Sequence, residues 1–392
     1  MEASVASLPS APPAARPQAD AAGVPWYVHA VLFASTSVIV GVLWDISWHQ
    51  SIGRDTLFSP PHLAIYLGGV VAGVVCGWHV LHLTLAGTQE ERAASVTWWK
   101  YFRGPLGAWT CIWGAFAMLT SAPFDDWWHN AYGLDVKILS PPHTVLAMGI
   151  LAIQMGALFM VLALQNRPGE RRVLPWMVAY AMGLVLLNFT TMVSEYTWRI
   201  FQHGSLFYQV AAGVVPLALA AAAVAGRLRW PATAAAAVYL GVLLLLTWIL
   251  PLFPAEPKLA PVRFQITQMM PPQFPLLLVV PAFFMDLVFH RMRGRSRWLL
   301  AAALGAAFLA AFFVVQWYFS LFLNSGYARN PVFGQHLRPY MLGEQSYLAR
   351  GAYMNPESGM VLAKGLAIAL GISVLSARLG LAWGDWMARV RR

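Results

Sequence analysis

Charged residues are scarce in this chain. Only 11% of its 392 residues are Asp, Glu, Lys or Arg, against about 25% in an ordinary soluble domain. Hydrophobic residues make up 59%. Apolar runs such as ATAAAAVYLGVLLLLTWILPLF, which begins at Ala232, reach the roughly 20 residues that a helix needs to cross a bilayer. The composition excludes a soluble protein and predicts an all-α, polytopic bundle of membrane helices.

Cysteine is almost absent. Cys76 and Cys111 both fall in expected spans and form no CxxC pair, which excludes a disulfide framework. The first 25 residues are rich in Ala, Pro and Ser and lack the basic-then-apolar order of a cleaved signal peptide. Residues 1–25 are therefore predicted to be a disordered tail.

The net charge of +10 does not indicate a nucleic-acid partner. The basic residues lie in short loops between apolar runs, and alternate loops differ sharply in their number. By the positive-inside rule, both termini are predicted to be cytoplasmic in a bacterial-type inner membrane. The expected partner is the lipid bilayer.

Hydropathy predicts about ten spans. They cover residues 26–46, 62–86, 104–124, 142–165, 173–198, 206–226, 231–253, 272–290, 298–323 and 358–378. The expected organisation is a four-helix module over 26–165 and a six-helix region over 166–392, the latter with outer loops at 254–271 and 324–357.

One charged motif occurs twice, each time where two apolar runs meet. The first copy, WDISWHQSIGRDTLFSPPH, covers residues 44–62, and the second, FDDWWHNAYGLDVKILSPPH, covers residues 124–143. Span, motif and span thus form a unit that repeats, so spans one and two are expected to be an internal repeat of spans three and four. Both motifs are predicted to lie at the periplasmic side.

Each copy supplies the ligands of a metal site. The matching residues are Asp45, His49 and His62 in the first copy, and Asp125, His129 and His143 in the second. An Asp and a His at i and i+4 lie on one face of a helix. The Ser-Pro-Pro-His sequence is typical of a helix start, with Ser as the N-cap, so the loop is expected to bring the second His back to the first. Two imidazoles and one carboxylate suit iron, copper or zinc.

Six further residues near the motifs are candidates for a supporting role. The candidates for orienting a ligand are Asp55, Asp135, Asp126 and Glu195. The first two follow motif glycines and are equally suited to stabilising a turn. Trp48 and Trp128 either wall a substrate pocket or belong to an interfacial aromatic belt.

The two motifs together resemble a known family. An Asp followed by WHQ and RDT-x-F-x-P-x-H is similar to the C subunit of the copper membrane monooxygenases, the particulate methane and ammonia monooxygenases. That family's copper site has the spacing Asp-x3-His-x12-His, which Asp45, His49 and His62 match. Its second site reads Asn-x3-His-x13-His, and the second copy here matches it with Asp125 in place of Asn. The resemblance covers about residues 40–145.

The resemblance implies a copper-dependent oxidoreductase that uses O2 to hydroxylate a small apolar or amine substrate. It also implies a quinol or periplasmic electron donor and either further monooxygenase-type subunits or a homo-oligomer. The last six spans have no counterpart in the resemblance. Two other readings of the residues stay open: a zinc-dependent membrane lipid hydrolase, and a copper-binding or copper-transfer protein without catalysis.

Overall fold

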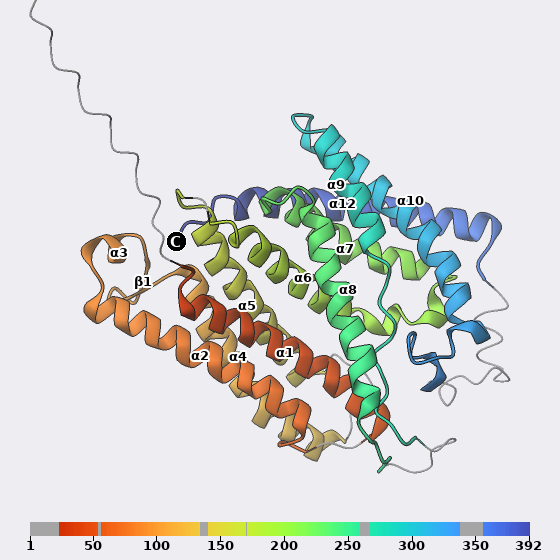
Figure 1. The fold of residues 1–392 in the computed structure, drawn as a ribbon, viewed down its shortest axis with the longest axis horizontal. Coiled ribbons are helices and arrows are strands. Elements are labelled where there is room, and N and C mark those ends of the chain that lie inside the picture. The colour runs from red at the N-terminus through yellow and green to blue at the C-terminus, as the bar shows by residue number, and fades with distance from the viewer. Residues whose placement is uncertain (1–22, 54–55, 134–139, 170, 259–265, 338–355) are drawn as a thin grey trace, which may run out of the picture.

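The computed structural model describes residues 23–53, 56–133, 140–169, 171–258, 266–337 and 356–392. Helices dominate these residues (Figure 1). They are α1 Trp26–Ser51, α2 Pro60–Ala86, α3 Gln89–Ala93, α4 Leu106–Tyr132, α5 Pro141–Gln165, α6 Leu174–Met192, α7 Ser205–Ala225, α8 Pro231–Ile249, α9 Val279–Arg291, α10 Arg297–Leu323 and α12 Gly359–Met387. Five short 3₁₀ helices are Ser194–Tyr196, Arg199–Phe201, Leu250–Leu252, Gly326–Ala328 and Gln335–Leu337.

The described strands form one antiparallel hairpin between α2 and α4. β1 Val96–Trp98 pairs with β2 Phe102–Gly104. The short helix α3 precedes the hairpin and carries a capping box. The Thr88 hydroxyl accepts from the backbone N–H of Glu91, and the Glu91 carboxylate accepts from the backbone N–H of Thr88. The Glu91 carboxylate accepts from the backbone N–H and also from the hydroxyl of Thr88, and these bonds hold the pKa of the exposed Glu91 below its ordinary value.

Eight helices of the described chain are long and apolar enough to cross a membrane, which confirms a helical membrane protein. They are α1, α2, α5, α6, α7, α8, α10 and α12. Two of the ten expected spans are not among them. The expected span 104–124 forms part of α4, a helix of 27 residues whose Trp, Ser, Thr and Gly content lowers its hydropathy. The expected span 272–290 is helical only from Val279 onward.

The non-helical segment before α9 is buried, and side chains from distant helices satisfy its backbone. The Met270 N–H donates to Ser51 Oγ at 2.7 Å, the Leu276 N–H to Tyr239 Oη at 3.1 Å, and the Leu277 N–H to Gln316 Oε1 at 3.1 Å. Irregular backbone at membrane depth is tolerated only where protein groups or water supply such bonds. The prediction of one continuous helix over 272–290 was wrong for this reason.

The first four long helices form the part of the bundle that carries the motifs. In Figure 1, α1, α2, α4 and α5 lie together on one side, with α6 between them and α7 to α12. Their contacts centre on small residues. A Cβ on Gly114 or Gly156 would lie within 2.7 Å of atoms on the partner helix of the α4–α5 pair. Such close backbone approach is the usual way in which membrane helices associate.

The start of α1 and the end of α12 lie at the same end of the bundle (Figure 1). Asn166, just after α5, donates to the carbonyls of Met387 and Val390 and so ties the chain's last residues to this end. The loops that join α5 to α6, α7 to α8 and α9 to α10 return here as well, and they carry seven of the chain's 22 arginines. Both charged motifs lie at the opposite end.

Candidate metal centre

Each motif begins in the last turns of one helix and ends in the first turn of the next. Asp45 and His49 belong to α1 and His62 to α2, while Asp125 and His129 belong to α4 and His143 to α5. The chain leaves α1 through Gly53 at φ 83° and leaves α4 through Gly133 at φ 86°. Such positive φ angles are the reason for glycine at this matching position.

The two helix starts differ in detail. Both have Ser at the N-cap and Pro in the first two positions, as the sequence indicates. The Ser140 hydroxyl accepts from the backbone N–H of His143 and so fixes the first turn of α5. The Ser59 hydroxyl instead accepts from the backbone N–H of Thr56 at 2.7 Å, which closes the turn in the preceding loop.

The second copy brings its three side chains to one point. One oxygen of Asp125, Oδ1, lies 3.5 Å from Nε2 of His129 and 3.3 Å from Nε2 of His143. One ligand atom from each residue lies within 4.8 Å of the other two. Among the described His, Cys, Asp and Glu residues, this is the one group of three that meets this spacing. The side chains are about 27–32% exposed, so water and small solutes reach them.

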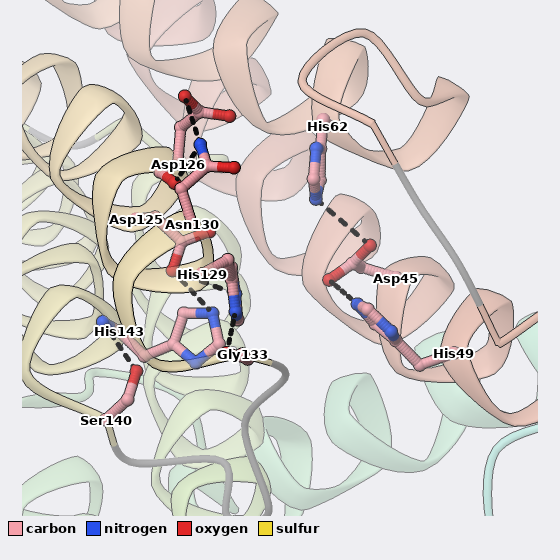
Figure 2. A network of polar contacts seen from close by, with 10 residues as sticks. All are labelled: Asp45, His49, His62, Asp125, Asp126, His129, Asn130, Gly133, Ser140 and His143. Atoms are coloured by element: carbon pink, nitrogen blue, oxygen red, sulfur yellow. Dashed lines mark hydrogen bonds and ion pairs between the residues drawn. The ribbon is translucent and has the colours of Figure 1, made fainter.

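The first copy does not meet this spacing, because its three ligand atoms do not all lie within 4.8 Å of one another. Asp45 lies between the two imidazoles (Figure 2) and faces them with different oxygens. Its Oδ2 lies 3.6 Å from Nε2 of His49, and its Oδ1 lies 3.4 Å from Nε2 of His62. His49 is the most exposed of the three, at 44%. The carboxylate thus bridges two imidazoles here, whereas in the second copy a single oxygen faces both.

In the second copy, the distances fit atoms that share a metal ion better than they fit direct hydrogen bonds. N–H···O bonds have donor–acceptor distances of about 2.9–3.0 Å, and all four Asp–His distances lie between 3.3 and 3.6 Å. Two ligand atoms that are each about 2.1 Å from a tetrahedral ion lie about 3.4 Å apart. The donor set of nitrogen and carboxylate oxygen is also the set that copper, iron and zinc accept.

The imidazole of His129 is held in the orientation that a metal ligand needs. Its Nδ1 lies 3.0 Å from the carbonyl oxygen of Gly133. A carbonyl only accepts, so Nδ1 carries the proton and donates it, and Nε2 presents its lone pair toward Asp125 and His143. A backbone carbonyl on the far ring nitrogen is a common support of metal-binding histidines.

A single cavity is bordered by all three residues of the second group and by Asp45 and His62 of the first, whereas His49 is not among its lining residues. Figure 2 shows the group from α4 and α5 on one side and the group from α1 and α2 on the other. The cavity has a volume of about 320 Å³. Its lining residues are Asp45, Thr56, Leu57, His62, Ile65, Tyr66, Ser121, Ala122, Asp125, Asp126, His129, Asn130, Gly133, Pro142, His143 and Leu146. The arrangement therefore has room for two ions and a small molecule between them.

The other candidates from the sequence lie in different places. Asp126 lines the cavity, and its carboxylate accepts from Asn130 Nδ2 at 3.3 Å. Trp48 packs against the core formed by the later helices, and Trp128 packs on Tyr132, with ring centroids 4.5 Å apart. Neither tryptophan lines the cavity.

The remaining candidates are Glu195, Asp55 and Asp135. Glu195 lies in the 3₁₀ helix Ser194–Tyr196, which follows α6, and is not among the lining residues. Asp55 and Asp135 lie outside the described residues.

Tyr66 and Asn130 line the cavity although the sequence reasoning did not single them out. The signal was present, because Tyr66 is four residues after His62 on α2 and so lies on the same helix face. Asn130 is four residues after Asp126 on α4 in the same way. Helical periodicity applied to the two ligand-bearing faces would have found both.

Searches against protein-family models, curated proteins and solved structures found no match to the chain.

Proposed function

We propose that the protein is a membrane-bound, metal-dependent monooxygenase related to the copper membrane monooxygenases. It would use O2 to hydroxylate a small apolar or amine substrate. The observation that supports this proposal most directly is the pair of Asp–His–His groups that face one cavity at the end of α1, α2, α4 and α5. The overall reaction is R–H + O2 + 2 e⁻ + 2 H⁺ → R–OH + H2O, in which a quinol supplies both electrons and both protons.

The side chains of the cavity have separate tasks in this proposal. A bound copper or iron supplies the electron transfer to O2 that protein side chains lack. His129, His143 and Asp125 would hold one ion, and His49, His62 and Asp45 would hold a second once His49 closes on the other two, with each carboxylate offsetting part of the positive charge. Three protein ligands per ion leave coordination positions free for small molecules.

The finer topology is part of the same proposal. The four motif-bearing helices are taken as a duplicated helix pair, and α4 and α9 complete ten membrane-crossing segments. The arginine-rich end would face the cytoplasm of a bacterial-type cell, so the metal cavity would open to the periplasm. Further subunits, or a second copy of the chain, would accompany it.

A zinc hydrolase is the second candidate, because the second Asp–His–His group alone fits a catalytic zinc site. Such sites have three protein ligands and one open position, and the three ligand atoms of the Asp125 group lie within 4.8 Å of one another. The bond attacked would be an ester or amide of a lipid, with water as the nucleophile. The remaining reading, a copper carrier, needs only the ligands and no turnover.

Metal content and oxygen consumption separate these three functions. The protein, purified into lipid nanodiscs, is analysed for bound metals and then supplied with a quinol, a candidate substrate and O2. Copper or iron with substrate-dependent O2 consumption supports the monooxygenase, and zinc with ester hydrolysis supports the hydrolase. Copper that exchanges with a chelator, without either activity, indicates a carrier.

A matched pair of histidine variants links either activity to this site. His129→Ala removes a proposed ligand, whereas His29→Ala removes an exposed histidine at the opposite end of α1. Loss of metal and activity in the first variant alone is the expected result. Equal loss in both, or in neither, contradicts the site assignment.

A further inference from the structure

A second, apolar cavity adjoins the metal cavity. It lies between α2 and α4 and has a volume of about 170 Å³. Its lining residues are Leu57, Phe58, Tyr66, Gly69, Val70, Ala115, Met118, Leu119 and Ala122. Apart from the tyrosine hydroxyl, these side chains carry no polar atom. We refer to this space as the apolar annex.

The annex and the metal cavity share part of their lining, so the two spaces adjoin and together give a path along the helices. Leu57, Tyr66 and Ala122 line both. On α4, the residues Ala115, Leu119, Ala122 and Asp126 follow one another at steps of three or four, which places them along one face of the helix. The path therefore runs from the acidic end of this face, at the metal cavity, to its apolar part.

The residues of α2 border the two cavities in the same order, from the metal cavity to the annex. His62 borders the metal cavity, Tyr66 borders both spaces, and Val70 borders the annex. At 1.5 Å per residue, Val70 lies about 12 Å further along the helix than His62. Since His62 is in the first turn of a membrane-crossing helix, the annex extends from the membrane surface toward its middle.

The annex opens toward lipid and is kept hollow by small residues. Val70 is 49% exposed and Leu119 is 64% exposed on helices that cross the membrane or pack beside one that does. Gly69 leaves space at the wall. A Cβ there would contact the side chain of Met118, of which the flexible end is nearest at 3.3 Å. An apolar chain could thus enter sideways from the bilayer.

The charges at the other end of the path favour a positively charged group. Three carboxylates line the metal cavity, those of Asp45, Asp125 and Asp126, and none of the described residues that line it is Lys or Arg. Two of the three carboxylates belong to the Asp–His–His groups. Asp126 belongs to neither, so it is the carboxylate that proposed metal ions would leave for an ammonium group, and Asn130 on the same helix donates to it.

We propose that the two joined cavities bind a primary alkylammonium ion, with its ammonium group at Asp126 and a single chain of about six carbons in the annex between α2 and α4. The chain would point to the membrane middle and the head to its surface, which is the orientation of any single-chain amphiphile in a bilayer leaflet. An annex of about 170 Å³ is close in size to the roughly 150 Å³ apolar cavity that takes up benzene, a six-carbon molecule. The inference that such ions are substrates rests on the proposed function, but the inference that they bind does not.

Chain length is the first test. Binding of n-alkylammonium ions from two to ten carbons is measured by calorimetry on the metal-loaded protein in nanodiscs without O2, with empty nanodiscs as the partition blank. The binding constant for the ion dissolved in water should rise about fourfold for each added carbon up to about six carbons and then stop rising. An affinity that follows only the partition into empty nanodiscs overturns the proposal.

Two glycine variants test the annex itself. Gly69→Leu places a side chain in the annex and should remove the gain from the third carbon onward. Gly77→Leu, two turns away on the same helix, meets no atom within 4 Å and should leave binding unchanged. If Gly69→Leu does not fold, as judged by lost metal, Val70→Phe tests the same space. Unchanged binding in a folded annex variant contradicts the proposal.

The role of Asp126 in binding is tested by comparing ligands with an ammonium or a hydroxyl head group. The wild type should bind hexylammonium about tenfold more tightly than hexanol, because a charge-assisted hydrogen bond is stronger than a neutral one, and Asp126→Asn should abolish that preference. Glu195→Gln removes a carboxylate at the same end of the bundle but outside the cavity and should keep it. A preference that survives Asp126→Asn refutes the role of this residue. Binding that behaves as expected without any O2 consumption would leave the alkylammonium site standing and refute the monooxygenase.

Discussion

Replacing the two motif aspartates by asparagine should weaken the two metal sites to different degrees. Asparagine keeps the shape of aspartate but offers one oxygen instead of two, and its amino group cannot act as a ligand. In the second copy, a single oxygen of Asp125 faces both imidazoles, at 3.5 and 3.3 Å. The amide oxygen of Asp125→Asn can occupy that position, so this variant loses charge but keeps the donor atom.

The first copy has no such substitute. Asp45 faces His49 with Oδ2 at 3.6 Å and His62 with Oδ1 at 3.4 Å. Asp45→Asn must turn its amino group toward one of the two imidazoles, so it loses both the charge and one donor position. Loss of a supporting group alone costs about 10- to 100-fold in metal affinity. We therefore expect about a tenfold loss in Asp125→Asn and about a 100-fold loss in Asp45→Asn.

At a fixed free-metal concentration, these losses in affinity give the wild type and the two variants different metal contents. With free metal at ten times the wild-type dissociation constant, each site is about 91% filled, a tenfold weaker site about 50%, and a 100-fold weaker site about 9%. The wild type should hold about 1.8 ions, Asp125→Asn about 1.4 and Asp45→Asn about 1.0. The assay is elemental analysis of metal per protein after equilibrium dialysis in a metal buffer. Equal losses in the two variants would refute the inferred difference in carboxylate geometry.

Three other predictions follow from the described residues. Gly133→Ala should lower the metal content of the protein. The φ of 86° and ψ of −168° at Gly133 suit only glycine, and forcing another residue into these angles costs about 1–3 kcal/mol. The resulting strain would displace the Gly133 carbonyl that orients His129. Gly169→Ala is the control, because Gly169 has a φ of 111° in the loop after α5, away from the site. This variant should keep its full metal content. A lower metal content in Gly169→Ala would mean that the effect of Gly133→Ala is not local. A cysteine placed at Phe58, which is 72% exposed, should react with a membrane-impermeant thiol reagent added outside intact cells. A cysteine placed at Trp99, which is 74% exposed at the other end of the bundle, should react only after lysis. Both native cysteines are buried, and the reverse labelling pattern would show that the topology is inverted. Burial lowers the pKa of His203 below its ordinary 6.5, partly opposed by its bond to a backbone carbonyl, so the stability that needs the neutral ring is full above pH 6.5 and is lost as pH falls through the lowered pKa. The thermal midpoint should accordingly drop on acidification, and His203→Gln should drop less; equal drops would contradict a role for this histidine.

The local features of the motifs could be predicted because they depend on neighbours in sequence. An Asp and a His four residues apart on a helix must share a face, and Ser-Pro-Pro-His does begin a helix in both copies. The matching glycines do adopt positive φ. The hydroxyl of Ser59 departed from the expected capping bond because Thr56, three residues back, offers it a closer donor.

The features that could not be predicted depend on residues far apart in the chain. Hydropathy assigns residues 272–290 to one span, since it scores side chains and ignores the backbone. The Met270 N–H is satisfied by Ser51, 219 positions away, and no local pattern contains that bond. In the same way, the annex exists only where the faces of α2 and α4 meet, so neither helix predicts it alone.

The two motif copies agree in sequence more closely than in structure, and the difference lies where the chemistry would be. Asp126 and Asn130 line the cavity from α4, whereas the matching positions on α1 are Ile46 and Gln50, neither of which lines it. Two equivalent metal sites would need no such asymmetry. A third carboxylate on one side of the cavity, aligned with an apolar annex on the same helix face, serves a molecule that has one polar end and one apolar end. The duplication would thus supply the metal ligands, and its divergence would supply the recognition of the substrate.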